Sequence, residues 1–284
     1  MFEEEYIKES IDKIKNKNIN LSADIFKINN NFSYKESLNY NLICLILFYN
    51  IADKDIYKYL KNLQDKTYLG YDTPYISLNN LKITTDKLVS LLDFDKIDRA
   101  FNLNNIKSIL EIGAGSGRTS EAILSIKNNI SYVICDIPPA IYISFKRLKL
   151  AYPDKAIEYL VDIQNKDELN KKIKKNNISF IYPHQMELIS KDAFDLTIAI
   201  DCFHEMDKKT IAHYFKNINN FSKNFYFSIW GNSKGNYTKT LFKKTERLNY
   251  YKGDYNIPKN WKINFEENLV FPANQLSLGF KIKN

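Results

Sequence analysis

Cysteine is scarce in this 284-residue sequence: there are only three, Cys44, Cys135 and Cys202, and they stand far apart. An odd number of widely spaced cysteines argues against both a disulfide framework and a zinc cluster. Each lies in an apolar stretch, so we expect three buried, reduced thiols. The chain also shows no internal repeat and no linker rich in proline or glycine.

Long hydrophobic runs are absent as well. The longest apolar stretch near the N-terminus, Leu42 to Ile51, is about half as long as a membrane-spanning helix needs to be. The first five residues, Met1 to Glu5, are mostly acidic, which does not fit a secretory signal peptide. We therefore expect a cytoplasmic protein that does not insert into a membrane.

The composition is that of a folded protein with a basic balance. Hydrophobic residues make up 44% and charged residues 26% of the chain, which excludes disorder throughout its length. The net charge is +8, which indicates either a solvated basic surface or an anionic partner. The lysines of 171–175 lack the interleaved aromatic residues of a single-strand-binding surface, so no nucleic-acid partner is expected.

Two regions differ in hydrophobic pattern. Residues 1–100 suggest helices broken by turns, and we expect a helical N-terminal domain there that covers an acceptor site. Residues 101–284 alternate short apolar runs with helical segments, which predicts an α/β fold with a mainly parallel, Rossmann-like sheet. Seven strands are expected, at Ser108–Ile112, Tyr132–Asp136, Ser179–Tyr182, Phe194–Asp201, Phe225–Trp230, Trp261–Phe271 and Gln275–Ile282. Ligands of such sheets bind beyond the carboxyl ends of the strands.

A glycine-rich turn follows the first of these strands. The segment from Glu111 to Gly117 has the spacing acid-x-Gly-x-Gly-x-Gly and leads into a predicted helix. Glycine allows a tight turn and a close approach of the backbone to a ligand. The second strand ends in Asp136, where a carboxylate commonly binds the hydroxyls of a ribose.

These residues leave alternatives open. A nicotinamide dinucleotide site would need Gly-x-Gly-x-x-Gly, but here the third glycine is one residue early and position 118 is arginine. A tight strand–helix turn that binds no ligand is the simplest alternative. The spacing from Glu111 to Gly117 instead resembles motif I of the class I S-adenosylmethionine-dependent methyltransferases.

The resemblance extends beyond this motif. Between about Lys107 and Asp207 the sequence resembles the sugar O-methyltransferases of bacterial surface-polysaccharide gene sets. The matching segments are Leu110–Ala122 (LEIGAGSGRTSEA), Asp136–Ala140, Pro183–Gln185, Phe194–Leu196 and Asp201–Met206 (DCFHEM). The N-terminal region and the last fifty residues match this family in general layout only.

The resemblance implies S-adenosyl-L-methionine as cofactor, S-adenosyl-L-homocysteine as product, and a set of cofactor-binding residues. Glu111, Gly113, Gly115 and Gly117 should line the methionine part of the cofactor, Asp136 the ribose, and Ile137, Gln185 and Met186 the adenine. Core packing is an equal alternative for Met186.

The predicted catalytic residues follow the fourth strand: Asp201, His204 and Glu205. A neutral sugar hydroxyl is a poor nucleophile, so a general base or a metal would assist its attack. His204 has the most suitable ordinary pKa, whereas the resemblance supports Glu205, since the Glu-Met pair is typical of the family. The three residues lack a recognisable ligand spacing, so no metal is predicted.

The expected partner is a small-molecule or glycan acceptor, with or without a phosphate group. Acceptor contacts are expected from the segment Trp230–Asn232 and from the tyrosine-rich loop Tyr68–Tyr75. A small phosphorylated metabolite is the alternative acceptor, and a catalytically inactive binding protein is the alternative function. The sequence defines neither the position that is methylated nor the oligomeric state.

Overall fold

The computed structural model describes residues 34–52, 54–63, 75–78, 81–230, 255–269 and 275–282. The chain divides into two compact units that alternate along the sequence. The first comprises residues 1–98, 114–129 and 137–155; the second comprises residues 99–113, 130–136 and 156–284. The division into functional domains near residue 100 stays a prediction.

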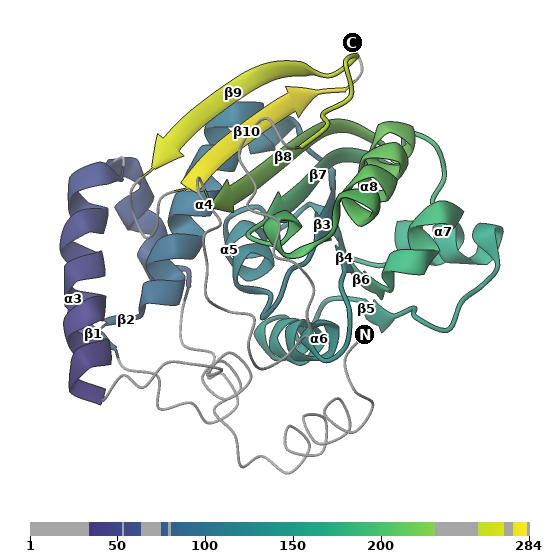
Figure 1. Cartoon of the computed structure of the whole chain (residues 1–284). Coiled ribbons are helices and arrows are strands. Elements are labelled where there is room, and N and C mark those ends of the chain that lie inside the picture. Colours follow the sequence, from purple (N-terminus) through teal and green to yellow (C-terminus); the bar gives the residue numbers. More distant parts are fainter. Residues whose placement is uncertain are drawn as a thin grey trace, which may run out of the picture. The chain divides into compact units, whose positions relative to one another are not determined.

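The second unit is built on one eight-stranded sheet in the order β5-β6-β4-β3-β7-β8-β10-β9 (Figure 1). Its strands are β3 (Ser108–Ile112), β4 (Ser131–Cys135), β5 (Ile157–Tyr159), β6 (Ile178–Ile181), β7 (Phe194–Ile200), β8 (Ser222–Trp230), β9 (Lys262–Leu269) and β10 (Gln275–Lys281). The first six pair in parallel, whereas β10 is antiparallel to both of its neighbours, β8 and β9.

This arrangement confirms the predicted Rossmann-like, mainly parallel sheet. Strands β3, β4, β6 and β7 are apolar runs that are almost entirely buried, as expected of central parallel strands. In the described residues this sheet has eight strands, one more than the seven predicted. The additional strand, β5, is a half-buried edge strand of three residues, which is too short to give a periodic signal.

Helix α8 (Lys208–Phe221) supplies much of the core of this unit. Its buried residues follow a helical period: Ile211, Tyr214, Phe215, Ile218 and Phe221. They meet the aromatic side chains of β8 and β10, where the rings of Phe225, Phe227 and Phe280 stack on one another. The helix begins at Asp207, whose carboxylate accepts a hydrogen bond of 2.7 Å from the backbone N–H of Thr210.

Three shorter helical segments and α7 (Lys166–Lys175) complete the second unit. These are the 3₁₀ turns η2 (Leu103–Asn105), η3 (Pro183–Leu188) and η4 (Phe203–Glu205). Turns η3 and η4 follow the carboxyl ends of β6 and β7, respectively. They therefore carry the segments after these strands where the sequence predicts site residues.

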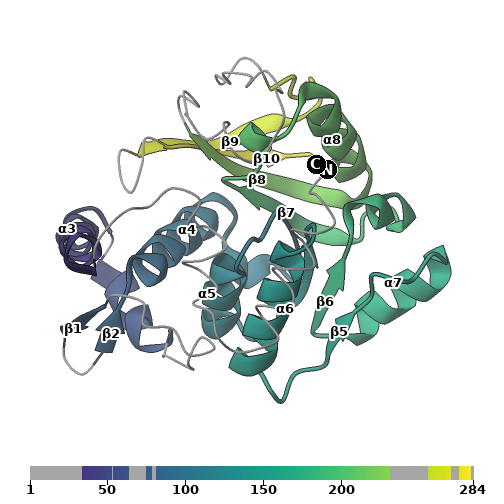
Figure 2. The same cartoon turned by 60° about the horizontal axis from the view of Figure 1, so that its bottom comes forward.

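The first unit is mainly helical within the described residues. It contains α3 (Tyr34–Ile51), η1 (Lys54–Lys61), α5 (Arg118–Ile126), α6 (Ala140–Ala151) and most of α4 (Thr85–Phe101). Helices α5 and α6 lie side by side (Figure 2). A short antiparallel hairpin, β1 (Ile76–Leu78) with β2 (Leu81–Ile83), was not predicted.

Three further observations concern the sequence predictions. Cys44, Cys135 and Cys202 are buried and free of disulfides, as predicted. Most of the loop Tyr68–Tyr75, from which acceptor contacts are expected, lies outside the described residues. None of the helices within the described ranges combines the length and apolar character that a membrane span requires.

Candidate functional site

The candidate site lies at the carboxyl ends of β3, β4 and β7. Residue pairing places these ends beside one another, because Ile112 pairs with Cys135 on one side and Ala199 on the other. In strand order, β4 and β6 continue on one side of β3 whereas β7 and β8 continue on the other. This is the point at which an open α/β sheet binds its ligands.

The glycine-rich turn after β3 has the backbone conformation that glycine permits. Gly113, Gly115 and Gly117 have φ values of 69°, 56° and 77°, in the left-handed region that other residues seldom occupy. The predicted need for glycine at these three positions is therefore confirmed. Gly117 then forms the N-cap of α5, whose first N–H groups have no partner within the helix.

Gly113 also leaves no room for a side chain. A Cβ atom at this position would lie 2.6 Å from Cβ and 2.9 Å from Sγ of Cys202. The Cys202 thiol in turn donates a hydrogen bond of 3.3 Å to the backbone carbonyl of Ile112. The residue after Asp201 thus packs directly against the start of the glycine-rich turn, a contact that the sequence did not reveal.

The acids at the ends of β3 and β4 are both buried. The Glu111 side chain accepts a hydrogen bond of 2.8 Å from the hydroxyl of Tyr132, and Glu111 is only 2% exposed. Burial, together with the nearby Glu111 charge, raises the pKa of Tyr132, so this hydroxyl keeps its proton. Asp136 directly follows β4 and is 8% exposed.

Four carboxylates gather around Cys202. Burial is the main cause of the raised pKa of its thiol, followed by the negative charges of Asp136, Glu205, Asp201 and Glu111. These four acids come from three separate segments of the sequence and were all predicted as site residues. The structure therefore places the predicted acids on segments that meet at the carboxyl ends of β3, β4 and β7, and we call Glu111, Asp136, Asp201 and Glu205 the acidic centre.

Asp201 has an unusual backbone and a partner that the sequence did not predict. It follows β7 with a φ of 53°. Both of its carboxylate oxygens accept from Nε2 of Gln275 at 2.9 and 2.8 Å. Because a carboxylate cannot donate, it fixes the orientation of the Gln275 amide. The buried Oε1 of this amide has no hydrogen-bond partner among the described residues. Gln275 lies 74 residues further along the chain, on β10.

His204 and Glu205 lie next to each other in η4, the turn after β7. Phe203 anchors this turn in the aromatic core, where it is 1% exposed and contacts Phe215 and Phe227. His204 is half-buried and Glu205 is exposed. The Glu205 carboxylate is thus the most accessible member of the acidic centre.

Two predicted adenine contacts have other roles in this structure. The Gln185 side chain is fully buried. Its Nε2 donates hydrogen bonds to the backbone carbonyls of Leu160 (2.8 Å) and Ile163 (2.7 Å). Its Oε1 accepts a hydrogen bond of 2.8 Å from the backbone N–H of Tyr182. These bonds use both amide protons and leave no donor for a ligand. Met186 is 1% exposed within the hydrophobic core. Both residues therefore support η3 from within, whereas Ile137 is 44% exposed and accessible to a ligand.

The remaining candidates contribute less to the site. His184 and His213 are exposed, and His213 lies on α8. The predicted acceptor segment Trp230–Asn232 cannot be placed, because the Trp230 side chain and the two residues after it lie outside the described part of the chain. Across the described ranges, no three or more His, Cys, Asp or Glu side chains are grouped so that they could hold a metal ion.

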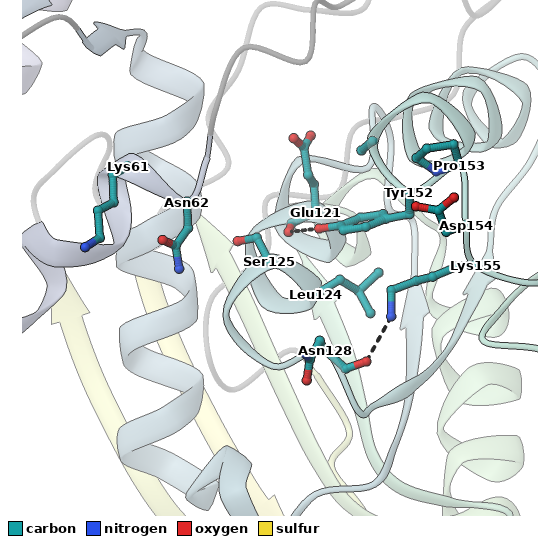
Figure 3. A pocket seen from close by; sticks show the side chains of 11 residues that line it. Lys61, Asn62, Glu121, Leu124, Ser125, Asn128, Tyr152, Pro153, Asp154 and Lys155 are labelled. Carbon is teal, nitrogen blue, oxygen red and sulfur yellow. Dashed lines mark hydrogen bonds between the residues drawn. The ribbon is translucent and has the colours of Figure 1, made fainter.

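A separate cavity of about 670 Å³ lies in the first unit (Figure 3). Leu124 and Ser125, near the end of α5, and Tyr152, after α6, contribute to its wall, and Lys61 comes from η1. Lys155 spans part of it and donates a hydrogen bond of 2.9 Å to the carbonyl of Asn128. The cavity thus borders the carboxyl end of α5, whereas the glycine-rich turn precedes the amino end, and no predicted site residue lines it.

Comparison with known proteins gives structural likeness alone. No protein-family model matches the sequence, and no curated protein matches it either. The PH0226 protein from Pyrococcus horikoshii OT3 has a TM-score of 0.45 at 13% identity, over 81% of this chain and 99% of its own. PigF with SAH has a TM-score of 0.44 at 14% identity, over 69% of this chain and 59% of its own.

The mitomycin 7-O-methyltransferase MmcR has a TM-score of 0.43 at 10% identity, over 68% of this chain and 54% of its own. This chain therefore matches little more than half the length of PigF and of MmcR. At such low identities and TM-scores, the likeness assigns neither a family nor a function to this chain.

Proposed function

We propose that this chain is an S-adenosylmethionine-dependent O-methyltransferase acting on a sugar, or a sugar-containing precursor, of a bacterial surface glycan. The observation that carries the proposal is the acidic centre beside a turn with three glycines in the left-handed region. In a chain of net charge +8, four carboxylates on segments that meet at the carboxyl ends of β3, β4 and β7 favour a cationic ligand. S-adenosylmethionine is such a ligand, because it bears a sulfonium and an ammonium group.

The residues at the ends of β3 and β4 fit the parts of this cofactor. The turn from Gly113 to Gly117 lets backbone N–H groups approach the methionine part without interference from a Cβ. The Asp136 carboxylate can accept hydrogen bonds from two ribose hydroxyls, and the exposed Ile137 side chain offers an apolar surface to the adenine. Gln185 and Met186 act indirectly, by holding η3 in place.

The turn after β7 supplies the groups that would handle the acceptor. When bound, the cofactor supplies an electrophilic methyl group, and the protein mainly positions the reactants. The exposed Glu205 carboxylate, with His204 beside it, accepts the proton that the attacking hydroxyl loses. Asp201 is held at a fixed orientation by Gln275 and binds a second hydroxyl of the acceptor.

The choice of a sugar acceptor depends on the sequence resemblance. The segments Asp136–Ala140 and Asp201–Met206 carry the likeness to the sugar O-methyltransferases, and both adjoin or contain members of the acidic centre. The positive net charge favours an acceptor that bears phosphate, such as a nucleotide sugar. A small phosphorylated metabolite would satisfy the same electrostatic argument.

Binding of S-adenosylhomocysteine, measured by calorimetry, is the first test. The wild-type chain should bind, and Gly115→Val should not, since valine is strained at a φ of 56°. Gly279→Ala is the matched control: it crowds β10, where the new Cβ would lie 3.0 Å from Phe265, but leaves the turn unchanged. If the wild-type chain does not bind S-adenosylhomocysteine, the proposal that it is a methyltransferase is contradicted, and a catalytically inactive binding protein is favoured.

Release of S-adenosylhomocysteine across an acceptor panel then tests the substrate. The panel contains nucleotide sugars, free and phosphorylated sugars, capsular fragments, small phosphorylated metabolites and a nucleic-acid control. Turnover with one class of sugar supports the proposal. Turnover with phosphorylated metabolites alone would show that the acceptor is a small phosphorylated metabolite and not a sugar. Glu205→Gln should lower turnover with little change in cofactor affinity.

A further inference from the structure

A buried ion cluster in the first unit adjoins the end of the glycine-rich turn. Asp93 and Lys96 of α4 are 0% and 1% exposed, respectively. The Arg118 guanidinium contacts Asp93 Oδ2 at 2.8 Å, and the Lys96 ammonium lies 3.5 Å from Oδ1. Arg118 is the first residue of α5 and directly follows Gly117. One buried carboxylate thus joins α4 to the residue where the turn becomes a helix.

The position of this arginine needs an explanation. A positive charge in the first turn of a helix opposes the helix dipole, so Arg118 is unfavourable there unless an anion compensates it. A buried carboxylate is likewise costly unless it is paired. Lys96 already lies close to Asp93, so the pairing with Arg118 adds a connection to α5 as well as further charge compensation.

A second arginine holds the other side of Gly117. The Arg147 Nε of α6 donates to Glu121 Oε2 of α5 at 2.6 Å. Its Nη1 donates to the hydroxyl of Ser116 at 3.1 Å and to the Ser116 carbonyl at 3.4 Å. Ser116 is therefore held by Arg147, which is ion-paired with Glu121, and Arg118 is held by its own ion pair with Asp93. Gly117 lies between Ser116 and Arg118 at a φ of 77°.

We propose that Arg118, through Asp93, is a positioning residue for the cofactor, which makes α4 part of the machinery that binds S-adenosylmethionine. This inference rests on the proposed function. Arg118 fixes the start of α5 and thereby the orientation of the N–H groups that the turn offers to the ligand. A misplacement of about 1 Å in such an element can cost on the order of 100-fold in function.

The test compares two substitutions in the same ion cluster. Arg118→Met removes the link between α4 and α5, whereas Lys96→Met removes the other partner of Asp93 and leaves that link intact. Each variant leaves Asp93 with one cation, so both should lower the melting temperature. Only Arg118→Met should weaken S-adenosylhomocysteine binding, by about tenfold or more in calorimetry. A merely structural role would affect both variants alike.

The outcomes separate this inference from the proposed function. Equal Kd values for Arg118→Met and Lys96→Met, with binding retained by the wild type, would overturn the positioning role alone. Absence of binding to the wild type would overturn the proposed function and this inference with it. If Arg118→Met does not fold, the milder Arg118→Gln is compared with Lys96→Met by the same criterion.

Discussion

Strand β7 carries an aspartate near each end, and the two are held in opposite ways. Asp195, near the amino end, accepts hydrogen bonds from the Lys107 N–H (2.9 Å), the Ser108 hydroxyl (3.3 Å) and the Lys223 ammonium (2.7 Å). Asp201, just past the carboxyl end, has a φ of 53° and is held by a glutamine whose own buried oxygen lacks a partner.

The contrast shows where this protein accepts a cost in stability. The Asp195 network joins β3, β7 and β8 at the amino ends of three parallel strands with each carboxylate oxygen paired. At the carboxyl ends, residues with a left-handed backbone lie beside the acidic centre. The buried Oε1 of Gln275, which has no hydrogen-bond partner among the described residues, lies there as well. Strain and unpaired groups that persist in a folded protein tend to cluster at functional sites. Substitutions at the carboxyl ends should therefore change ligand binding or turnover, whereas substitutions at the amino ends should change only the stability of the fold.

The largest effect is expected from Gly113→Ala, at the carboxyl end of β3. The new Cβ combines a positive φ with a 2.6 Å contact to Cys202 Cβ, and should cost about 3 kcal/mol of unfolding free energy and abolish S-adenosylhomocysteine binding. Denaturant unfolding and calorimetry measure the two effects. The double variant Gly113→Ala/Cys202→Gly removes the clash but keeps the strain, so it should recover part of the stability. A double variant no more stable than Gly113→Ala would mean that the contact is unimportant.

Gln185→Leu should be nearly as destabilising without weakening cofactor binding. The substitution leaves the carbonyls of Leu160 and Ile163 and the N–H of Tyr182 without this partner, which should cost about 3 kcal/mol. The Kd for S-adenosylhomocysteine, measured at a temperature where the variant is folded, should match that of the wild type. A large rise in Kd with little loss of stability would restore Gln185 as an adenine contact.

Gln275→Leu should separate the two functions of the site. It removes the amide that donates to both oxygens of Asp201, so we expect turnover to fall by about tenfold, as for the loss of other orienting partners. Cofactor affinity should stay unchanged, because β3 and β4 supply the cofactor contacts. Steady-state kinetics with the acceptor identified by the panel, together with calorimetry, measure the difference. Loss of affinity without loss of turnover would place Asp201 on the cofactor side.

The smallest effect is expected from Asp195→Asn, at the amino end. Burial raises the pKa of Asp195, but hydrogen bonds from Lys223 and from the Lys107 N–H outweigh it and leave the pKa below its ordinary value. The ionised carboxylate therefore stabilises the fold above the unfolded-state pKa, and this stabilisation is lost as pH falls through the folded-state pKa. Because Lys223 is 52% exposed, the loss in Asp195→Asn should stay below about 1 kcal/mol at pH 7.

Urea unfolding at pH 7 and below pH 4 checks this prediction. The difference between wild type and Asp195→Asn should shrink in acid, and cofactor binding should be unaffected at neutral pH. A change in turnover comparable to that of Gln275→Leu would remove the distinction between the two ends of β7.

The features that the sequence predicted are those encoded by consecutive residues. The run Phe194–Ile200 predicts a buried strand, and the glycines at 113, 115 and 117 predict a tight turn, because each signal is local. Strand β5 was missed because its three residues are too few to give a periodic signal. The acids Glu111 and Asp136 were found because the ends of parallel strands meet at one edge of the sheet.

The missed features depend on partners that are distant in sequence. Gln275 lies 74 residues from Asp201, and Arg118 lies 25 residues from Asp93, so no spacing rule connects either pair. Gln185 illustrates the opposite error. A polar residue in the right loop suggested a ligand contact, but its amide satisfies backbone groups at Leu160 and Ile163 that only the folded chain brings near.

The alternation of the two units along the chain has a consequence for synthesis and for protein engineering. The polypeptide passes from one unit to the other five times before residue 157, so neither unit corresponds to a single uninterrupted fragment. During translation, Asp93 is made 25 residues before Arg118, and the first unit can close only after α6 has been made. A gene cut at residue 100 would separate the two partners onto different polypeptides.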